Sequence, residues 1–282
     1  MQTQIFHIHA LSPVHVGIGQ AVGTVDLPIA RERATNLPLI PGSALKGVLR
    51  DEFAADPAAQ KTLFGPDSLG DGAAHAGAVA FGDAWLLALP VRALVGTVCF
   101  ATAPFLLSRY RQAAARCGLP DLPAIPELEE DQAAVTSGSR LLHKGTLVLE
   151  DLDLGSRAMP LADQWASVLG AAVRDESWRP HFVARFAILP DAVFGFLADT
   201  GTEVRARIRI DDKHGTVQHG ALWYEENLPA ESLLFGILGF DKARDGSATD
   251  VQAAFAGRLG GEALIQIGGK ATVGRGLVRF LA

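Results

Sequence analysis

Asp26 is the residue whose setting most suggests catalysis, because it lies in a glycine-flanked loop shortly before Arg31 and Arg33. The segment 23–33 reads GTVDLPIARER. A magnesium ion commonly binds proteins through one or two carboxylates together with the phosphate oxygens of a substrate. Asp26 could therefore hold Mg²⁺ beside a phosphodiester, or it could form a turn, as loop aspartates often do. The spacing alone leaves both interpretations open.

The first of three clusters suited to an anion is the segment 41–50, PGSALKGVLR, which ends at Arg50. Its apolar spacing predicts a helix over 43–53 with Ser43 as N-cap. Lys46 would then lie in the first turn, where a cation opposes the helix macrodipole. That placement suits a phosphate contacted by the ammonium group and by backbone N–H groups. A solvated lysine is the alternative.

The second cluster is the segment 204–210, VRARIRI, which predicts a strand. Because side chains alternate across a strand, one of its faces carries Arg205, Arg207 and Arg209. Such a row could follow a phosphate backbone, or acids such as Asp211 and Asp212 could neutralise it. Trp223 and Tyr224, beyond the turn, could stack on bases or belong to the core.

The third cluster is the segment 268–276, GGKATVGRG, near the end of the chain. Glycine lets a backbone approach a ligand closely, and the loop contains Gly268, Gly269, Gly274 and Gly276. Lys270 and Arg275 add positive charge. The loop leads into a strand, whereas a dinucleotide-binding motif opens a helix, and it lacks the ending of a P-loop.

Histidines offer a competing interpretation. His7 and His9 lie on one face of a predicted strand, and His15 follows nearby. Three histidines could serve a metal-dependent hydrolase, but no HExxH motif accompanies them. Histidines packed on a sheet are the alternative.

Composition limits these possibilities. The 282 residues are 49% hydrophobic and 20% charged, which is typical of a globular chain. The net charge is −6, so a nucleic-acid site requires a local concentration of basic side chains. The apolar stretches are too short to cross a bilayer. The pair Cys99 and Cys117 forms neither a disulfide framework nor a zinc motif, which favours a reducing cytoplasm.

The elements that must position these residues are both strands and helices. Strands are predicted over 4–11, 79–87, 96–100, 204–210, 263–267 and 277–281. Helices are predicted over 43–53, 104–117, 163–173, 231–238 and 250–259, with loops over 65–77 and 119–138. Because strands and helices interleave without regular βαβ spacing, we expect an α+β fold.

Four segments together resemble the CRISPR RAMP proteins, and they span both ends of the chain. They are residues 15–19 (HVGIG), 25–32 (VDLPIARE), 37–50 (LPLIPGSALKGVLR) and 268–276. Two further segments, 81–92 (FGDAWLLALPVR) and 220–229 (GALWYEENLP), resemble the repeated backbone subunit of the type III-B (Cmr) effector complex.

This resemblance implies a single RAMP domain over residues 1–282, with an RRM-like, ferredoxin-like core and insertions. A protruding β-hairpin, called the thumb, is expected at about 204–230. In such complexes several copies stack as a helical filament along the CRISPR guide RNA, together with other Cmr subunits. The thumb interrupts the duplex that the guide forms with complementary target RNA.

The resemblance also implies roles for residues. Asp26 matches the catalytic aspartate of the family, which implies Mg²⁺-dependent cleavage of target RNA at regular intervals. Near that position fall His15, Tyr224, Glu225 and Glu226. The glycine loop and the segment with Ser43, Lys46 and Arg50 are expected to contact the guide. A non-catalytic RNA-binding subunit of the same assembly is the alternative.

Overall fold

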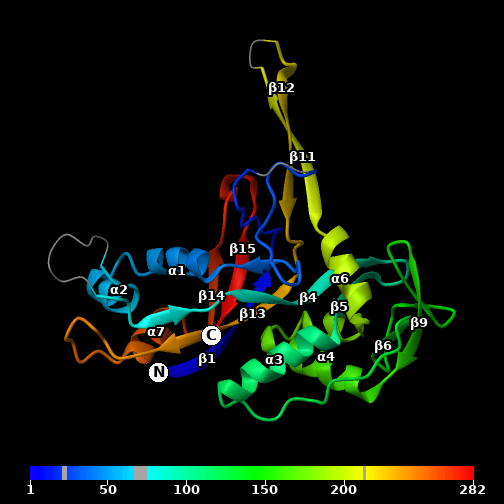
Figure 1. Ribbon diagram of the computed structural model, residues 1–282, viewed down its shortest axis with the longest axis horizontal. Helices are drawn as coiled ribbons and strands as arrows, with labels where there is room; N and C mark the ends of the chain where they lie inside the picture. The colour runs from blue at the N-terminus through cyan, green and yellow to red at the C-terminus, as the bar shows by residue number, and fades with distance from the viewer. Residues whose placement is uncertain (21–23, 67–74, 212–213) are drawn as a thin grey trace.

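The computed structural model describes residues 1–20, 24–66, 75–211 and 214–282, so Gly23 and most of the predicted loop 65–77 lie outside the described residues. Its main body is a thirteen-stranded sheet in the order β14-β15-β1-β13-β4-β5-β10-β6-β9-β8-β7, with β2 paired to β4 and β3 to β13. Helices pack against this sheet, and a separate two-stranded hairpin projects from it (Figure 1). The expected mixed α+β class is confirmed.

The elements follow one another along the chain without long helices. The strands are β1 (Gln2–Ala10), β2 (Leu39–Ile40), β3 (Val79–Phe81), β4 (Ala84–Ala93), β5 (Thr97–Thr102), β6 (Gln132–Val135), β7 (Leu142–His143), β8 (Thr146–Leu149), β9 (Leu152–Ala158), β10 (Phe186–Ile188), β11 (Glu203–Ile210), β12 (Val217–Asn227), β13 (Leu233–Phe240), β14 (Glu262–Gln266) and β15 (Leu277–Leu281). The helices are α1 (Gly42–Asp51), α2 (Pro57–Phe64), α3 (Pro104–Arg116), α4 (Pro160–Ala172), α5 (Arg179–Val183), α6 (Asp191–Thr200) and α7 (Val251–Leu259), with a 3₁₀ turn η1 (Ala271–Val273). Within the described ranges, no helix has the length and apolar character needed to cross a bilayer.

Four strands form the centre of the sheet in the order β15-β1-β13-β4, and all neighbours are antiparallel. Along the chain α1 lies between β1 and β4, and α7 lies between β13 and β15. Two apolar clusters cover these strands. One includes Phe6 with Leu45 of α1 and Phe255 of α7, and the other includes Phe235 with Trp165 of α4.

The predicted helix over 231–238 is wrong, because this segment forms most of the central strand β13. Its residues are almost all buried, and they alternate between the two apolar clusters. Leu234 and Leu238 belong to one cluster, whereas Leu233 and Phe235 belong to the other. A strand buried on both faces reads as a continuous apolar run, which periodicity cannot distinguish from a buried helix.

Several predicted boundaries also change. Helix α1 begins at Gly42 with Pro41 as N-cap, so Ser43 lies in the first turn and does not cap the helix. The predicted strand over 79–87 is broken between β3 and β4, and β4 continues through Pro90. The predicted loop over 119–138 contains β6. Helices α3 and α7 form within one residue of prediction, and Asp250 caps α7 through the N–H of Ala253.

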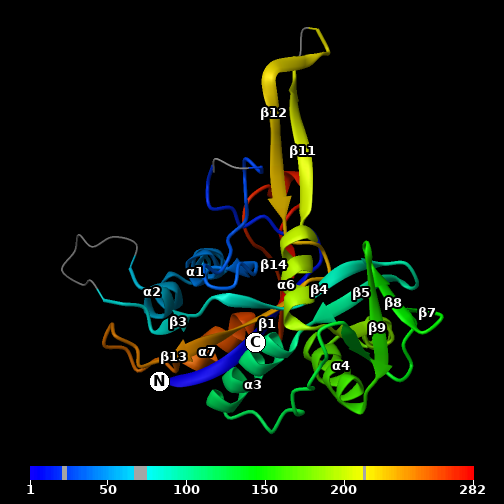
Figure 2. The ribbon, with the colours of Figure 1, turned by 45° about the vertical axis from the view of Figure 1, so that its right-hand side comes forward.

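The hairpin of β11 and β12 stands away from the body in both ribbon views (Figures 1 and 2). Its register pairs Arg205 with Glu225 and Arg207 with Trp223, so one face is polar and charged. The opposite face carries exposed apolar side chains, which are Val204, Ile208, Ile210, Val217, Leu222 and Tyr224. A two-stranded hairpin is only marginally stable by itself, so its root depends on contacts with the body.

Replacing Gly236 by Ala should destabilise the centre of the sheet. A Cβ at Gly236 would lie 2.4 Å from Cζ of Phe6 and 2.6 Å from the carbonyl oxygen of Asp83. Overpacking of this kind costs about 1–3 kcal/mol. Urea denaturation should show a lower midpoint at an unchanged slope.

Gly257→Ala is the matched control, because a Cβ there would meet no described atom within 4 Å. Since Gly257 lies inside α7, this substitution should stabilise the protein by about 0.8–1.0 kcal/mol. Equal midpoints for the two variants would contradict the close packing at Gly236.

Candidate functional site at the root of the hairpin

Three segments that are far apart in sequence meet at the root of the hairpin. They are residues 13–20 with 24–31, the end of β12, and the loop 267–276 between β14 and β15 (Figures 1 and 2). Val14 forms a bridge with Leu228 beside β12. The N–H of Gly269 donates to the carbonyl oxygen of His15 at 2.9 Å. The predicted catalytic loop, the root of the hairpin and the glycine loop therefore form one site.

The backbone of residues 26–28 lies along β12 like a short additional strand. The N–H of Leu27 donates to the carbonyl oxygen of Tyr224 at 3.1 Å, and the N–H of Glu226 donates to the carbonyl oxygen of Leu27 at 3.0 Å. Asp26 itself is exposed, and its Oδ2 accepts a hydrogen bond from the N–H of Tyr224 at 2.8 Å. The hairpin thus holds one oxygen of a solvent-facing carboxylate.

Glu226 is buried beneath this loop, and its carboxylate accepts hydrogen bonds from two parts of the chain. Oε2 accepts from the N–H of Ile29 at 3.0 Å. Oε1 accepts from Arg31 at 2.6 Å and from the hydroxyl of Thr202 at 2.9 Å. Buried charges require such partners.

Glu225 points to the other side of β12, toward the glycine loop. Its Oε2 lies 3.1 Å from Nε of Arg207, and its Oε1 lies 3.0 Å from Nζ of Lys270 and 2.8 Å from Nε1 of Trp223. Burial acts to raise the pKa of Glu225, but the hydrogen bonds from Trp223, Lys270 and Arg207 outweigh it and lower the pKa to about 2. Glu225 is therefore an ionised counter-ion joining the hairpin to the loop.

His15 fills the space between the three segments and is buried. Its Nδ1 lies 2.7 Å from the carbonyl oxygen of Glu226. Because a carbonyl can only accept, Nδ1 carries the hydrogen. A Cβ at Gly17 would lie 2.8 Å from Nε2 of His15, and one at Gly268 would lie 2.3 Å from its carbonyl oxygen. Gly268 is therefore required by its close approach to the backbone of His15, whereas a side chain at Gly17 would displace the His15 ring.

The glycine loop concentrates positive charge beside the hairpin. Lys270 adopts a left-handed conformation with φ 69°, next to the 3₁₀ turn η1. Arg275 is buried, and its Nε has no hydrogen-bond partner among the described residues. Burial and the nearby charges of Arg205 and Arg207 lower the pKa of Arg275. A buried guanidinium with an unused donor beside other cations suits an anionic ligand.

The row of arginines on β11 is partly neutralised by Glu203 and Glu225, which were not the acids expected from the sequence. Arg205 pairs with Glu203 at 2.7 Å, and Arg207 pairs with Glu225. Arg209 is exposed further along the hairpin. The predicted acid Asp212 lies outside the described residues.

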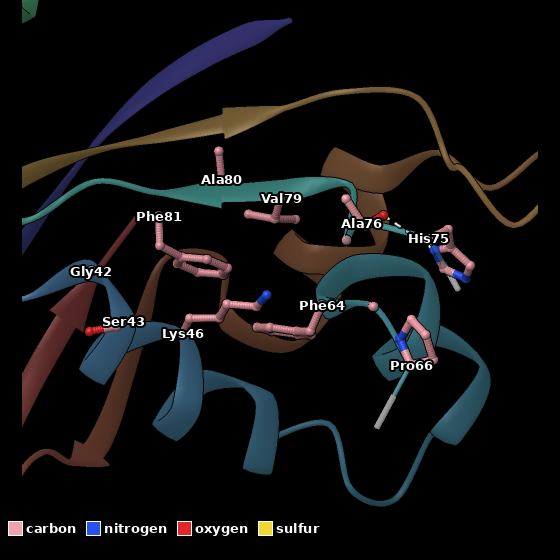
Figure 3. A pocket seen from close by; sticks show the side chains of 12 residues that line it. Gly42, Ser43, Lys46, Phe64, Pro66, His75, Ala76, Val79, Ala80 and Phe81 are labelled. Carbon is pink, nitrogen blue, oxygen red and sulfur yellow. Dashed lines mark hydrogen bonds between the residues drawn. The ribbon is translucent and has the colours of Figure 1, made fainter. Parts of the chain in front are cut away.

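Ser43 and Lys46 of the predicted cluster on α1 line a separate cavity of about 440 Å³, whereas Arg50 does not line it. Figure 3 shows the side chain of Lys46 extending between Phe64 and Phe81, with Ser43 one turn earlier. The N–H of Gly42 donates to Oδ1 of Asp83 at 2.8 Å, so a carboxylate already lies at the start of the helix. Arg50 lies one turn beyond Lys46 and donates to the carbonyl oxygen of Gly65 at 2.9 Å.

The histidines do not converge. His7 lies 3.0 Å from the hydroxyl of Tyr110, and burial lowers the pKa of His7 to about 4. His9 lies 2.9 Å from Oε2 of Glu231, whereas His15 contacts Glu226. In the ranges that the structure describes, no three His, Cys, Asp or Glu residues gather as metal ligands. The interpretation as a histidine-based metal hydrolase therefore has no structural support.

Sequence reasoning placed Asp26, His15 and residues 224–226 near one another through the resemblance. It mentioned Arg31 only as a charge near Asp26, and it gave Thr202 no role. The pairing of Arg31 with Glu226 joins residues 195 positions apart, and neither spacing nor composition signals it.

The fold and the basic site at the hairpin root define a RAMP protein. The family model for the RAMP superfamily matches residues 7–279, and the chain belongs to this superfamily.

A more specific likeness comes from individual relatives. The chain is 34% identical to the "CRISPR system Cmr endoribonuclease Cmr4" of Pyrococcus furiosus, over 99% of this chain and 95% of that protein. The crystal structure of oligomeric Cmr4 from Pyrococcus furiosus superposes with a TM-score of 0.77 at 27% identity, covering 100% of this chain and 97% of the other. A chain of the type III-B Cmr-beta complex bound to cognate target RNA shares the fold, with a TM-score of 0.76 at 22% identity, covering 100% and 97%.

Glu225 should make stability depend on pH in the acid range. Because its folded pKa of about 2 lies below the ordinary 4.5, its ionised form stabilises the folded state above about pH 4.5. That contribution is lost as the pH falls from about 4.5 toward 2. The difference in unfolding free energy between the wild type and Glu225→Gln should therefore shrink over this range.

Urea denaturation of both proteins, down to the lowest pH at which they stay folded, measures this difference. The exposed Glu129→Gln is the matched control and should differ little from the wild type at any pH. A difference for Glu225→Gln that does not change with pH would contradict the ion pairing.

Proposed function

We propose that this chain is a guide-RNA-binding subunit of a type III-B CRISPR effector complex that cleaves complementary target RNA. Its membership of the RAMP superfamily and its likeness to a Cmr endoribonuclease over almost the whole chain support this function. The observation that carries the cleavage step is the exposed carboxylate of Asp26, whose Oδ2 is held by the N–H of Tyr224 on the hairpin. Its partners are the guide RNA, the target RNA, further copies of this chain and other Cmr subunits.

The topology supports the finer description of the fold. The order β15-β1-β13-β4, with α1 and α7 as the two helical connections, is a βαββαβ arrangement with antiparallel neighbours. We therefore interpret these elements as the RRM-like, ferredoxin-like core of one domain. We interpret the hairpin of β11 (Glu203–Ile210) and β12 (Val217–Asn227) as the thumb that was expected at about 204–230.

An acidic chain can bind RNA in this way because base pairing between guide and target supplies the sequence specificity. The protein then needs contacts with the phosphate backbone and with the shape of the duplex. Lys270 and Arg275 in the glycine loop and Lys46 on α1 provide positive charge at two places, while the rest of the surface can remain acidic. The row of arginines on β11 extends the first of these places along the hairpin.

The donor set at Asp26 fits magnesium, since one carboxylate with phosphate oxygens and water is a common arrangement for this ion. When bound, Mg²⁺ would stabilise negative charge that develops on the phosphate. The N–H of Tyr224 orients the carboxylate of Asp26 toward solvent. The hairpin would hold one target nucleotide out of the duplex, so that its 2′-hydroxyl aligns with the adjacent phosphate.

Asp26→Ala should abolish cleavage and leave RNA binding nearly unchanged. Metal stabilisation of the transition state is worth several kcal/mol, so the single-turnover rate should fall at least about 10²-fold. The assay uses the complex assembled with guide RNA and a labelled complementary target, with and without Mg²⁺. Asp153→Ala, an exposed acid on β9, is the control and should cleave at regular intervals like the wild type.

Two other outcomes would change the proposal. Guide-dependent binding without cleavage in either protein would make the chain a non-catalytic subunit. Equal loss of binding and cleavage in Asp26→Ala would assign Asp26 a structural role.

Lys46→Ala should weaken guide binding and reduce its dependence on salt. For a single-stranded RNA, removing one phosphate contact lowers the slope of log K against log salt by about 0.7. Binding of guide RNA across a series of NaCl concentrations measures this slope. The exposed Lys242→Ala is the control, and an identical slope for both variants would exclude a phosphate contact at Lys46.

A further inference from the structure

We propose that Glu226 is a positioning residue which, through Arg31 and the backbone of Ile29, keeps Asp26 in register with the hairpin. This inference rests on the proposed function, because it explains how the carboxylate used for cleavage is held. It assigns Glu226 no direct contact with RNA or metal.

The contacts of Glu226 exclude it from the reacting groups. Its side chain is only 8% exposed. Oε2 is bonded to Ile29, and Oε1 is bonded to Arg31 and Thr202. These donors come from the loop that carries Asp26 and from the turn before β11, so the carboxylate joins the two.

Arg31 extends this connection to helix α6. Its guanidinium donates to the carbonyl oxygen of Ala198 at 3.2 Å and to that of Asn36 at 2.7 Å. Ala198 lies in the last turn of α6, where a cation interacts favourably with the helix dipole. Because α6 leads directly into β11, Arg31 and Glu226 tie the loop to both strands of the hairpin.

The register of the loop against β12 determines where Asp26 points. Leu27 is bonded to Tyr224 and Glu226 through its own N–H and carbonyl groups, and Ile29 is bonded to Glu226 two residues further along. A slip by one residue would turn alternate side chains to the opposite side. Glu226 therefore fixes Asp26 relative to the part of the chain that would hold the target.

The neighbouring Glu225 serves as a comparison for Glu226 within the same strand. Adjacent residues on a strand point to opposite sides, and Glu225 contacts Lys270 and Arg207 instead of the loop with Asp26. Loss of Glu225 should alter RNA binding, whereas loss of Glu226 should alter the rate of cleavage.

A double-mutant cycle in the assembled complex tests the proposal. The variants are Arg31→Ala, Glu226→Ala and the combination, with single-turnover cleavage measured at saturating target and at several Mg²⁺ concentrations. Each single variant should cleave about 10- to 100-fold more slowly, because a misplacement of about 1 Å can cost 10²-fold. The two rate losses should be less than multiplicative in the combination, since both residues share the contact between Arg31 and Glu226.

Further measurements distinguish a loss of positioning from a general loss of structure in the variants. Target affinity should stay within about twofold of the wild type, and half-saturation with Mg²⁺ should shift to higher concentration. Glu226→Gln keeps one acceptor oxygen and should recover part of the rate. If a single variant leaves a buried charge unpaired and fails to fold, the combination removes both charges and carries the test. The exposed Glu129→Gln is the control.

Comparing Asp26→Ala with the Glu226 variants distinguishes a failure of the positioning role from a failure of the proposed function. If Asp26→Ala still cleaves normally, the assignment of Asp26 is wrong. If Asp26→Ala is inactive but the Glu226 variants cleave like the wild type, only the positioning role is overturned. Rate losses that multiply in the combination would also overturn it.

Discussion

The need to pair two adjacent buried carboxylates organises the root of the hairpin. Glu225 and Glu226 lie at neighbouring positions of β12 and are almost fully buried. A buried carboxylate is unfavourable unless it is paired and hydrogen-bonded. Because neighbouring side chains on a strand point to opposite sides, the two acids draw in different partners. One holds Lys270 of the glycine loop and the other holds Arg31 near Asp26, so the site exists only where these segments meet the hairpin.

This arrangement separates binding from positioning. The basic side chains near Glu225 lie beside the buried Arg275, whose Nε has no hydrogen-bond partner among the described residues. Together they form a local positive region on a chain whose net charge is −6. The groups around Glu226 form a closed network that faces the loop carrying Asp26. A phosphate backbone would interact with the first set, while the second set remains inside the protein.

The sequence predicted those strands and helices whose formation depends mainly on residues close together along the chain. The alternation of β1 and the helical segments of α3 and α7 are visible in the sequence. Strand β13 was not predictable, because burial on both faces removes its alternation. The row of arginines on β11 was predicted, but its partners Glu203 and Glu225 depend on register and tertiary contacts. Asp26 was singled out by resemblance more than by spacing, and its contact with Tyr224 could not be predicted.

The location of Asp26 at the root of the hairpin has a consequence for an assembly of identical chains. Asp26 is bonded to the backbone of β12, and the same strand continues into the projecting part of the hairpin. Every copy therefore carries its carboxylate at the same place relative to its own hairpin. If copies repeat along a guide RNA, the interval between cleavage positions equals the interval between subunits, because both are determined by one rigid relation within the chain. The contacts that hold residues 26–31 against the hairpin are then sufficient to make the cleavage positions regular.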